Sequence, residues 1–371
     1  MPHVVLVTGV SRHIGARVAS VLADDPDIDR VVGVDTVPPP SLTGDGGVPL
    51  GRTEFVRVDP RGPDIARVIA DADIDTVVHM SLVSAPPRSG GRTLMKEHNV
   101  IGTMQLLGAC QRSATIRRVV VRSTTAVYGS SPRDPAVFTE DAEPGEPPGR
   151  GYAKDASEVE GYVRGFARRR GDVAVSTLRF ANFMGPGVDS PLTRYFTQPL
   201  LPTVFGFDPR LQFVHEDDAV EVLRRMATED HPGTFNVAGD GVLLLSQCAR
   251  RAGLLPLPVP SPVFRLMGEL ARGARLVDFS SEQLRLMRHG RVVDTAPLAA
   301  ALGWRPKFST AAAFEDFLRA RDLAGGIPAA LLEVFSQAAG SRAAGSRTAG
   351  SRTAGSRTAG SRAAGSRAAG R

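Results

Sequence analysis

The stretch VVLVTGVSRHIG occupies residues 4–15 and carries the strongest indication of the fold. Its first four apolar residues predict a short buried strand, and Gly9 predicts a tight turn directly after it. Apolar residues then recur at helical spacing over residues 14–22. A strand, a glycine turn and a helix N-terminus together form a site for a pyrophosphate, because the first backbone N–H groups of the helix point at the anion.

The glycines of this turn match the dinucleotide-binding pattern only in part. Gly9 permits the turn, and Gly15 permits close packing of the helix on the strand. The middle glycine of the pattern is absent, so Arg12 or His13 stands where the backbone should approach the phosphates most closely. We expect Gly9, Arg12, His13, Ile14 and Gly15 to contact the cofactor.

An aspartate follows at the end of the second expected strand. Asp35 lies 20 residues after Gly15, a spacing that suits a carboxylate bonded to a ribose 2′-hydroxyl. Such a carboxylate repels a 2′-phosphate, whereas Arg12 attracts one. We therefore expect NAD rather than NADP. An ordinary turn aspartate before the prolines at 38–40 is the alternative.

Strand-like and helix-like segments alternate along the first half of the chain. The expected strands are 4–7, 30–34, 54–58, 76–78, 118–121 and 173–178, and the expected helices are 14–22, 65–70, 94–110 and 156–170. This alternation predicts an α/β fold, with a Rossmann-type doubly wound parallel sheet covered on both faces.

The pattern changes after about residue 180. Strands become sparse, prolines gather between 256 and 262, and short helices are expected, for example over 263–271. We expect an NAD-binding domain over 1–180 and a smaller substrate-binding domain over 181–330, interleaved with the first. The second domain should close over the carboxyl ends of the strands, where such sheets bind ligands.

The basic character of the chain belongs to its last residues. The formal net charge is +6, but residues 338–371 repeat the pentad Ala/Thr-Ala-Gly-Ser-Arg and hold seven arginines and no acid. Without them, 38 basic residues face 39 acidic ones. We expect a disordered tail, with an arginine arm for polyanions as the alternative. The neutral body predicts no specific nucleic-acid partner.

Other classes of protein fit the composition poorly. No apolar run approaches the ~20 residues of a membrane span, and the chain begins in a strand without a basic segment before it. The two cysteines, Cys110 and Cys248, lack metal-ligand spacing. We expect a cytoplasmic protein with reduced thiols, no signal peptide, no membrane partner and no metal site.

Several further segments, in chain order, resemble motifs of the extended short-chain dehydrogenase/reductases. This is the NAD-dependent epimerase/dehydratase family, which includes UDP-glucose 4-epimerase, and the resemblance covers roughly residues 3–320. The matching segments are 58–59, 77–81, 99–103, 123–129, 178–187, 213–218 and 302–307. Many matches in the right order support the same fold as the strand pattern.

The resemblance implies several cofactor contacts. Asp59, followed by Pro60, matches the strand end whose aspartate contacts adenine. The fourth-strand motif that lines the cofactor includes His79, Met80 and Ser81. Asn99 matches a helix asparagine that stabilises the sheet near the active site.

The resemblance also implies substrate contacts. Asn182 matches an asparagine that faces the nucleotide-sugar. Arg291 matches an arginine that grips the diphosphate of a UDP-sugar, and a guanidinium suits paired phosphates. A surface arginine is the alternative reading of Arg291. The family's arginine before the 213–215 strand is replaced by Leu211, although Arg210 adjoins it.

The expected catalytic pair is a hydroxyl and a tyrosine. By resemblance, Thr124 binds the substrate oxygen and Tyr152 is the general base, although Thr124 could also be a strand-end threonine bonded to backbone. A free tyrosine has a pKa of about 10 and needs a nearby cation to act at neutral pH. The family places a lysine four residues beyond the tyrosine, and here Ala156 stands there; the position of Glu160 confirms this register.

Lys154 stands only two residues beyond Tyr152. On a helix it would point about 200° away from the tyrosine, compared with about 40° for a residue four positions on. The two side chains could converge only if the helix began later, capped by Asp155 or Ser157. Our hypothesis is that Lys154 or a nearby arginine supplies the missing charge.

Together these features predict an NAD-dependent epimerase, dehydratase or reductase that acts on a nucleotide-sugar. The resemblance adds the expectation of a homodimer, paired through the helices that carry Asn99 and Tyr152. One alternative is a dinucleotide-binding sensor or scaffold that has lost turnover, because the lysine and the middle glycine are both absent. Another is a reductase of a hydrophobic alcohol or ketone, with residues 254–266 lining its pocket.

Overall fold

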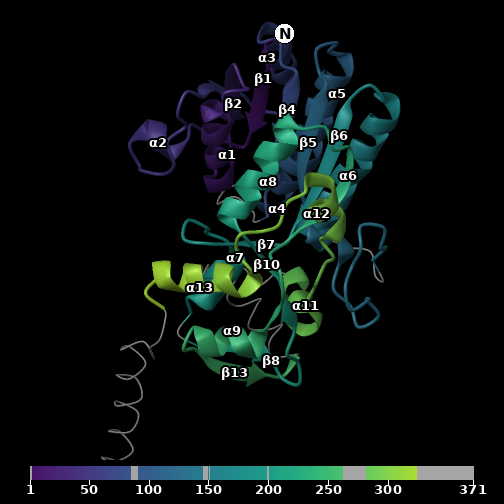
Figure 1. Cartoon of the computed structure of the whole chain (residues 1–371). Coiled ribbons are helices and arrows are strands. Elements are labelled where there is room, and N and C mark those ends of the chain that lie inside the picture. Colours follow the sequence, from purple (N-terminus) through teal and green to yellow (C-terminus); the bar gives the residue numbers. More distant parts are fainter. Residues whose placement is uncertain are drawn as a thin grey trace, which may run out of the picture. The chain divides into compact units, whose positions relative to one another are not determined.

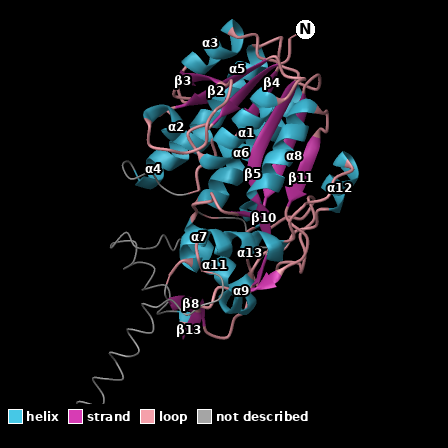
Figure 2. Cartoon of the chain, turned by 60° about the vertical axis from the view of Figure 1, so that its left-hand side comes forward, coloured by secondary structure: helices cyan, strands magenta, loops and turns pink. Residues whose placement is uncertain are grey.

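Seven parallel strands form the central sheet, in the order β11-β6-β5-β4-β1-β2-β3 (Figures 1 and 2). Their bounds are β1 Val4–Thr8, β2 Arg30–Asp35, β3 Glu54–Arg57, β4 Thr76–His79, β5 Arg118–Thr124, β6 Ala174–Phe180 and β11 Gly233–Val237. The chain runs outward from β1 in one direction and then resumes at β4 in the other, so the strand order reverses beside β1. The α/β class and the doubly wound parallel sheet are confirmed.

The computed structural model describes residues 2–323, apart from 85–90, 145–148, 150, 199 and 262–280. All of them belong to one of the two compact units of the chain, Met1–Gly326. The repeat tail at 338–371 and the helix expected over 263–271 lie outside the described residues. Among those that are described, no helix is long and apolar enough to cross a membrane.

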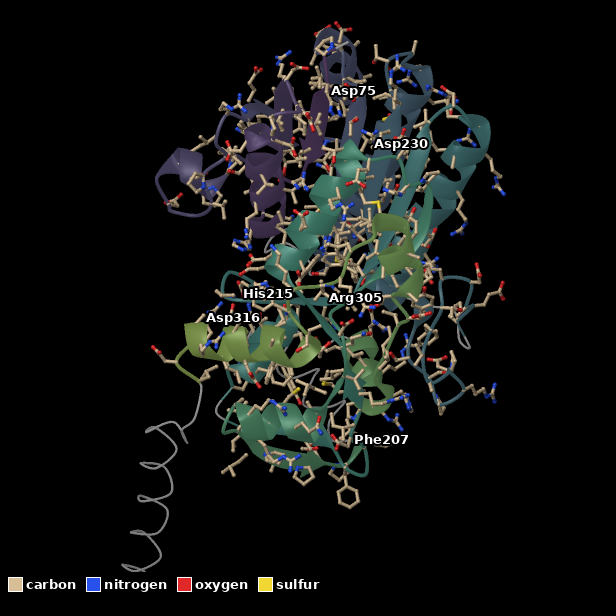
Figure 3. The ribbon with its side chains drawn as sticks, in the orientation of Figure 1. Asp75, Phe207, His215, Asp230, Arg305 and Asp316 are labelled. Carbon is tan, nitrogen blue, oxygen red and sulfur yellow. The ribbon has the colours of Figure 1, made fainter. Side chains whose placement is uncertain are left out.

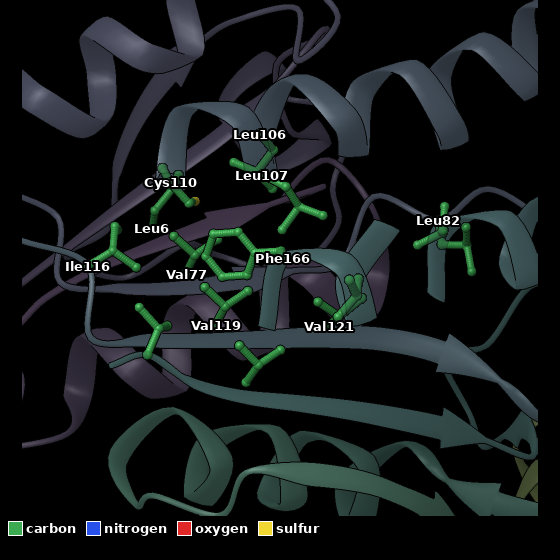
Figure 4. Close-up of a cluster of buried hydrophobic side chains, with 14 of the residues drawn as sticks. Leu6, Val77, Leu82, Leu106, Leu107, Cys110, Ile116, Val119, Val121 and Phe166 are labelled. Carbon is green, nitrogen blue, oxygen red and sulfur yellow. The ribbon is translucent and has the colours of Figure 1, made fainter. Parts of the chain in front are cut away.

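Helices cover both faces of the sheet, which explains why its strands are continuous apolar runs. One face carries α3 (Asp64–Asp71), α5 (Gly102–Arg112) and α6 (Tyr152–Arg169). Figure 4 shows Leu106, Leu107 and Cys110 of α5 in contact with the strand residues of this core. The other face carries α1 (His13–Asp24) and α8 (Glu216–Thr228).

The helix expected over 94–110 is continuous but changes its pitch. It consists of α4 (Gly91–Lys96), a π-helical stretch over Glu97–Ile101 and α5. The π-helical stretch contains Asn99, and such stretches are often found at functional sites.

The chain after residue 180 holds more strands than expected. The described residues contain β7 Asn182–Met184, β8 Leu200–Val204, β9 Arg210–Leu211, β10 Phe213–His215, β12 Leu243–Leu244 and β13 Leu255–Val259, besides β11. They are short, and β13 contains two prolines, a pattern tolerated in edge strands because proline cannot donate a ladder hydrogen bond. We did not expect a strand at β13 because of its prolines.

Four further described helices pack around these short strands: α7 Pro191–Phe196, α9 Leu245–Arg251, α11 Ser281–His289 and α13 Thr310–Ala320. The described residues also contain α2 Pro40–Thr43, which follows β2, and α12 Ala296–Leu302, which packs in the core of α1 and α8. Stacked and edge-on rings of Phe196, Phe213 and Phe314 form the centre of a separate apolar core. The same part of the chain contributes β11 to the seven-stranded sheet and α8 to the helices that cover it.

The segments 213–218 and 302–307, which both resemble family motifs, lie close together in the structure. The carboxylate of Asp218 accepts hydrogen bonds from the backbone N–H groups of Lys307 and Phe308, at 2.8 and 2.9 Å. The ring of His215 stacks on Phe308, and its Nε2 lies 3.1 Å from Asp316 Oδ2 (Figure 3). These contacts give the segments 213–218 and 302–307 a structural role in tying α8, β10 and α13 together.

The turn between β1 and α1 depends on its two glycines. Gly9 has a φ of +79°, a conformation that residues with a side chain rarely adopt. A Cβ atom on Gly15 would lie 2.2 Å from the carbonyl oxygen of Gly9. Helix α1 can approach β1 this closely only because position 15 carries no side chain.

We therefore expect Gly15→Ala to lower the free energy of unfolding by about 3 kcal/mol, because the backbone must move to admit the methyl group. Chemical denaturation measures the change. Gly171→Ala is the matched control, since a Cβ there meets nothing within 4 Å. It should change the free energy by less than about 0.5 kcal/mol. Equal effects of the two substitutions would contradict the packing argument.

Candidate active site

A cavity of about 600 Å³ lies at the carboxyl ends of the central strands. Its walls come from the turn before α1, the segments that follow β4, β5 and β6, the first turn of α6, the loop before α7, and α11. This is the edge of a doubly wound sheet at which ligands bind, and the volume lies within the ~300–1,000 Å³ typical of ligand pockets.

The turn predicted to bind pyrophosphate forms one wall of this cavity. Arg12, His13, Ile14 and Gly15 all line it. No side chain caps the N-terminus of α1, so the backbone N–H groups of its first turn are not used by a capping residue. Burial lowers the pKa of Arg12, although the charge of Asp35 opposes the change.

His13 is held against the second half of the chain. Its Nε2 is hydrogen-bonded to Glu216, whose other oxygen accepts a bond from the Gly187 backbone N–H at 2.9 Å. Burial raises the pKa of Glu216, but the bonds from His13 and Gly187 outweigh it and lower the value. A Cβ on Gly187 would lie 2.2 Å from the His13 ring, so only glycine fits there. Sequence reasoning did not anticipate this contact.

The acidic residues predicted to contact the nucleoside lie beyond the cavity wall. Asp35 accepts hydrogen bonds from the backbone N–H groups of Ser11 at 3.1 Å and Thr36 at 2.7 Å. Asp59 pairs with Arg61, which lowers the pKa of that carboxylate, and the neighbouring Pro60 is buried. Their roles in binding stay predictions.

Of the predicted fourth-strand residues, only Met80 lines the cavity. The side chains of His79 and Ser81 are buried, and the His79 ring bonds Thr8 and Thr103, each at 2.9 Å. The predicted contacts of His79 and Ser81 with the cofactor stay predictions.

Asn99 clamps the segment that follows β4. Its Oδ1 accepts a bond from the Val83 backbone N–H at 2.8 Å, and its Nδ2 donates to the Val83 carbonyl at 3.0 Å. Asn99 is buried, so it shapes the cavity through Val83 and not by direct contact.

Thr124 and Tyr152 meet at the centre of the site. Thr124 ends β5, Tyr152 begins α6, and both line the cavity. Thr124 Oγ1 accepts a bond from the Ala126 backbone N–H at 3.2 Å. Burial raises the pKa of Tyr152, and the charge of Arg122 and the nearby Thr124 hydroxyl oppose this change.

The hypothesis that Lys154 turns back to Tyr152 is wrong for this structure. Helix α6 begins at Tyr152, after Gly151, and not at a later cap. The Lys154 side chain is 46% exposed, and its Nζ lies 3.9 Å from Glu158. Ala156, at the family's lysine position, is fully buried in the apolar core.

Four charged residues that sequence reasoning missed also line the cavity: Arg92, Arg122, Asp189 and Glu282. Arg122 could have been found, because it lies two residues before Thr124 on a strand, where alternate side chains share a face. Glu282 accepts a bond from the Ala153 backbone N–H at 3.1 Å, and burial raises its pKa. No local pattern predicts a contact across 129 residues.

The predicted substrate residues, Asn182 and Arg291, both line the cavity. Arg291 donates to the Gly129 carbonyl at 2.7 Å and to Ser130 Oγ at 3.1 Å. Burial lowers its pKa to about 10, so it stays protonated at neutral pH. A guanidinium has five N–H donors, so these two bonds leave others for a ligand. Arg210 is exposed and bonds the Ala136 carbonyl.

The cavity is rich in positive charge. Its described walls hold four arginines (Arg12, Arg92, Arg122 and Arg291) and two carboxylates, Asp189 and Glu282. Asp189 is paired with Arg194, outside the cavity, and Arg92 with Asp155. Such a lining favours anionic ligands. Within the described residues, no group of three His, Cys, Asp or Glu side chains could hold a metal ion.

Comparison with known proteins agrees with this geometry. The family model described as the NAD dependent epimerase/dehydratase family matches residues 5–238. An uncharacterised protein of Mycobacterium tuberculosis is 47% identical over 322 residues, which cover 87% of this chain and 85% of that protein. Human short-chain dehydrogenase/reductase family 42E member 1 is 29% identical over 238 residues, covering 58% of this chain and 56% of its own.

Solved structures share the fold. The dTDP-glucose 4,6-dehydratase DesIV of Streptomyces venezuelae, with NAD and TYD bound, superposes with a TM-score of 0.66 at 23% identity, covering 86% of this chain and 97% of that chain. The UDP-glucuronic acid 4-epimerase of Bacillus cereus, in complex with UDP-glucuronic acid and NAD, has a TM-score of 0.64 at 18% identity. The match covers 86% of this chain and 99% of that chain.

The buried His79 makes the free energy of unfolding of the protein depend on pH. Burial, with the nearby charges of His98 and Arg122, lowers its pKa from 6.5 to about 3. A folded-state pKa below the unfolded one means that the unfolded chain gains a proton first as the pH falls. Stability is therefore complete above about pH 6.5 and is lost towards pH 3, at about 1.4 kcal/mol per pH unit.

His79→Gln, which cannot be protonated, should remove this slope. We expect the wild-type protein to lose about 2–3 kcal/mol more than the variant between about pH 6 and pH 4. Denaturant unfolding at a series of pH values measures both slopes, and carboxylate effects cancel in the difference. Parallel curves would contradict a neutral buried His79.

Proposed function

The chain belongs to the NAD-dependent epimerase/dehydratase family, and from this premise we propose that it is an NAD-dependent oxidoreductase or isomerase acting on a nucleotide-sugar. One observation carries the proposal. The pyrophosphate turn, the side chains of Thr124 and Tyr152, and Arg291 all line the same cavity.

The turn before α1 fits a dinucleotide. A Cβ at position 15 would strike the Gly9 carbonyl, so the helix N-terminus lies directly at the turn, and no side chain occupies its backbone donors. Arg12 adds a positive charge on the same wall. These residues would hold the phosphates, and the two backbone bonds to Asp35 would fix its carboxylate for a ribose hydroxyl. This supports NAD in preference to NADP.

The residues of the chain carry the proton chemistry. Bound NAD would supply an acceptor for a hydride from the sugar carbon and, once reduced, a donor that returns it. Tyr152, as phenolate, removes the proton of the reacting hydroxyl and later gives it back. Thr124, on the same cavity wall, holds the same substrate oxygen by a hydrogen bond.

The substrate proposal rests on the charge of the cavity. Arg291 is partly buried at the cavity wall, is held by two hydrogen bonds and has further N–H donors for a diphosphate. Asn182 lies on the same wall. Two proteins of the same fold are named for nucleotide-sugar substrates, dTDP-glucose and UDP-glucuronic acid. We propose a sugar linked to a nucleoside diphosphate for this chain as well.

A second candidate is a dinucleotide-binding sensor without turnover. Ala156 leaves the helix of Tyr152 without the family's lysine, and burial raises the pKa of that tyrosine, which weakens it as a base. The hydrophobic-alcohol reading has less support. Leu255 and Leu257 of β13 are exposed and do not line the cavity, and residues 262–266 lie outside the described part of the chain.

We further propose a cytoplasmic homodimer that pairs through the helices of Asn99 and Tyr152. The support is that three large apolar side chains on these helices, Ile101, Met104 and Tyr162, are exposed. Contiguous exposed apolar surface is typical of subunit interfaces.

Released ligand and thermal stability test the function most simply. We expect acid treatment of the purified protein to release NAD, and a UDP-sugar to raise the unfolding temperature of the protein. Ligand at 100 times its Kd stabilises a protein by about 2.7 kcal/mol. NAD without a sugar response would favour the sensor, NADP would contradict the role of Asp35, and no dinucleotide would contradict both candidates.

The control for the sugar response is a pair of arginine variants. Arg291→Met should abolish the response to the UDP-sugar and retain the dinucleotide. Arg210 is exposed and bonds only a backbone carbonyl in the described structure, so Arg210→Met should retain both the sugar response and the dinucleotide.

Tyr152→Phe should lower kcat by a factor of about 10²–10⁴ without changing the affinity for NAD, because only the proton transfer is lost. Steady-state kinetics and equilibrium binding give the two quantities. Tyr162→Phe removes a hydroxyl from an exposed position on the same helix and should leave kcat unchanged. Full activity of Tyr152→Phe would exclude Tyr152 as the base.

A further inference from the structure

Helix α6 brings no cation to Tyr152 at the position where the family has its lysine. That position is Ala156, whose side chain is fully buried among apolar residues of the core. Lys154 is half exposed and lies next to Glu158. A charge that assists Tyr152 must therefore come from another element.

Strand β5 provides a positively charged side chain, Arg122, at the cavity. Arg122 and Thr124 lie two residues apart on this strand, so their side chains share a face, and both line the cavity with Tyr152. Ser123, between them, donates to Glu160 of α6 at 2.6 Å. The end of the strand thus places a cation and a hydroxyl at the cavity that Tyr152 also lines.

The guanidinium of Arg122 is held in place but not neutralised. Its Nη1 donates to the Leu82 carbonyl at 2.7 Å, and its Cζ lies 5.0 Å from the centre of the Phe183 ring. Its Nε is buried without a hydrogen-bond partner. Among the described residues, no carboxylate forms an ion pair with Arg122. A fixed, uncompensated charge at a cavity wall is an arrangement that acts on its neighbours.

Four charged groups from four elements act on or near Tyr152: Arg12, Arg122, Glu282 and Arg291. Glu282 raises the pKa of the tyrosine, and the arginines lower it. After burial, Arg122 has the largest effect. Arg291 is bonded to Gly129 and Ser130 and faces Glu282. Arg122 is therefore the best placed of these cations.

We propose that Arg122 supplies the positive charge beside Tyr152 that the residue at position 156 does not, and so acts as a positioning residue for the proton transfer. The inference rests on the proposed function for its consequence, but the electrostatic coupling is a property of the protein itself. It also explains how a member of the family can carry alanine at this position and keep a working base.

Fluorine NMR tests the coupling without any need for turnover. Difluorotyrosine incorporated at position 152 ionises at lower pH than tyrosine, and its fluorine resonance reports the ionisation of this one side chain. In Arg122→Gln the pKa of the phenol should rise by about one unit or more, a tenfold loss of phenolate at a given pH. Arg122→Lys, which keeps the charge, should stay within about half a unit of the parent protein.

Lys154→Gln is the matched control, because it removes a cation from the same helix as Tyr152 but outside the cavity. Its titration should coincide with that of the parent. If Arg122→Gln does not fold, Arg122→Met, which keeps the alkyl stem against Phe183, takes its place. An unchanged titration in the folded neutral variant, or a shift in Lys154→Gln as large as in Arg122→Gln, would overturn the proposal. The phenol pKa at position 152 could shift only in the neutral Arg122 variants while the protein turns over no nucleotide-sugar. That result would support the role of Arg122 and contradict the proposed function.

Discussion

The site depends on the contact between Gly15 and the Gly9 carbonyl oxygen. A Cβ at Gly15 would lie 2.2 Å from that oxygen, so helix α1 starts at the strand end only because no side chain intervenes. This start places His13 on the cavity wall, where its bond to Glu216 connects the first half of the chain to the second. Glu216 in turn holds the Gly187 backbone. One backbone contact thereby sets the position of the pyrophosphate turn and of the segments facing it.

The electrostatics of the cavity follow from which charges are paired and which are not. Arg92 is neutralised by Asp155, whereas Arg122 has no carboxylate partner among the described residues. Burial alone would make Tyr152 a poor base, because water no longer stabilises its phenolate. The arginines of β5 and of the α1 turn oppose this effect. In our proposal, Arg122 takes the place of the lysine that the family carries at position 156 of α6.

Local patterns in the sequence predicted the fold well. Alternating strands and helices and the glycine turn gave the doubly wound sheet, and resemblance placed Thr124 and Tyr152, which the structure brings together. The start of α6 was missed because Gly151, with a φ of +85°, ends the preceding loop directly before the tyrosine. Glu282 was missed because it reaches the site from far along the chain. Contacts set by tertiary packing leave no mark in neighbouring residues.

The central claim is that the cavity holds a dinucleotide and a nucleotide-sugar together, with Thr124 and Tyr152 between them. A crystal structure of the protein with NAD and a UDP-sugar tests it most directly. We predict the pyrophosphate of NAD at the turn before α1, the sugar diphosphate at Arg291, and a sugar hydroxyl within hydrogen-bond distance of Tyr152. A UDP-sugar bound outside this cavity, or a sugar whose hydroxyl groups all lie away from Tyr152, would contradict the account.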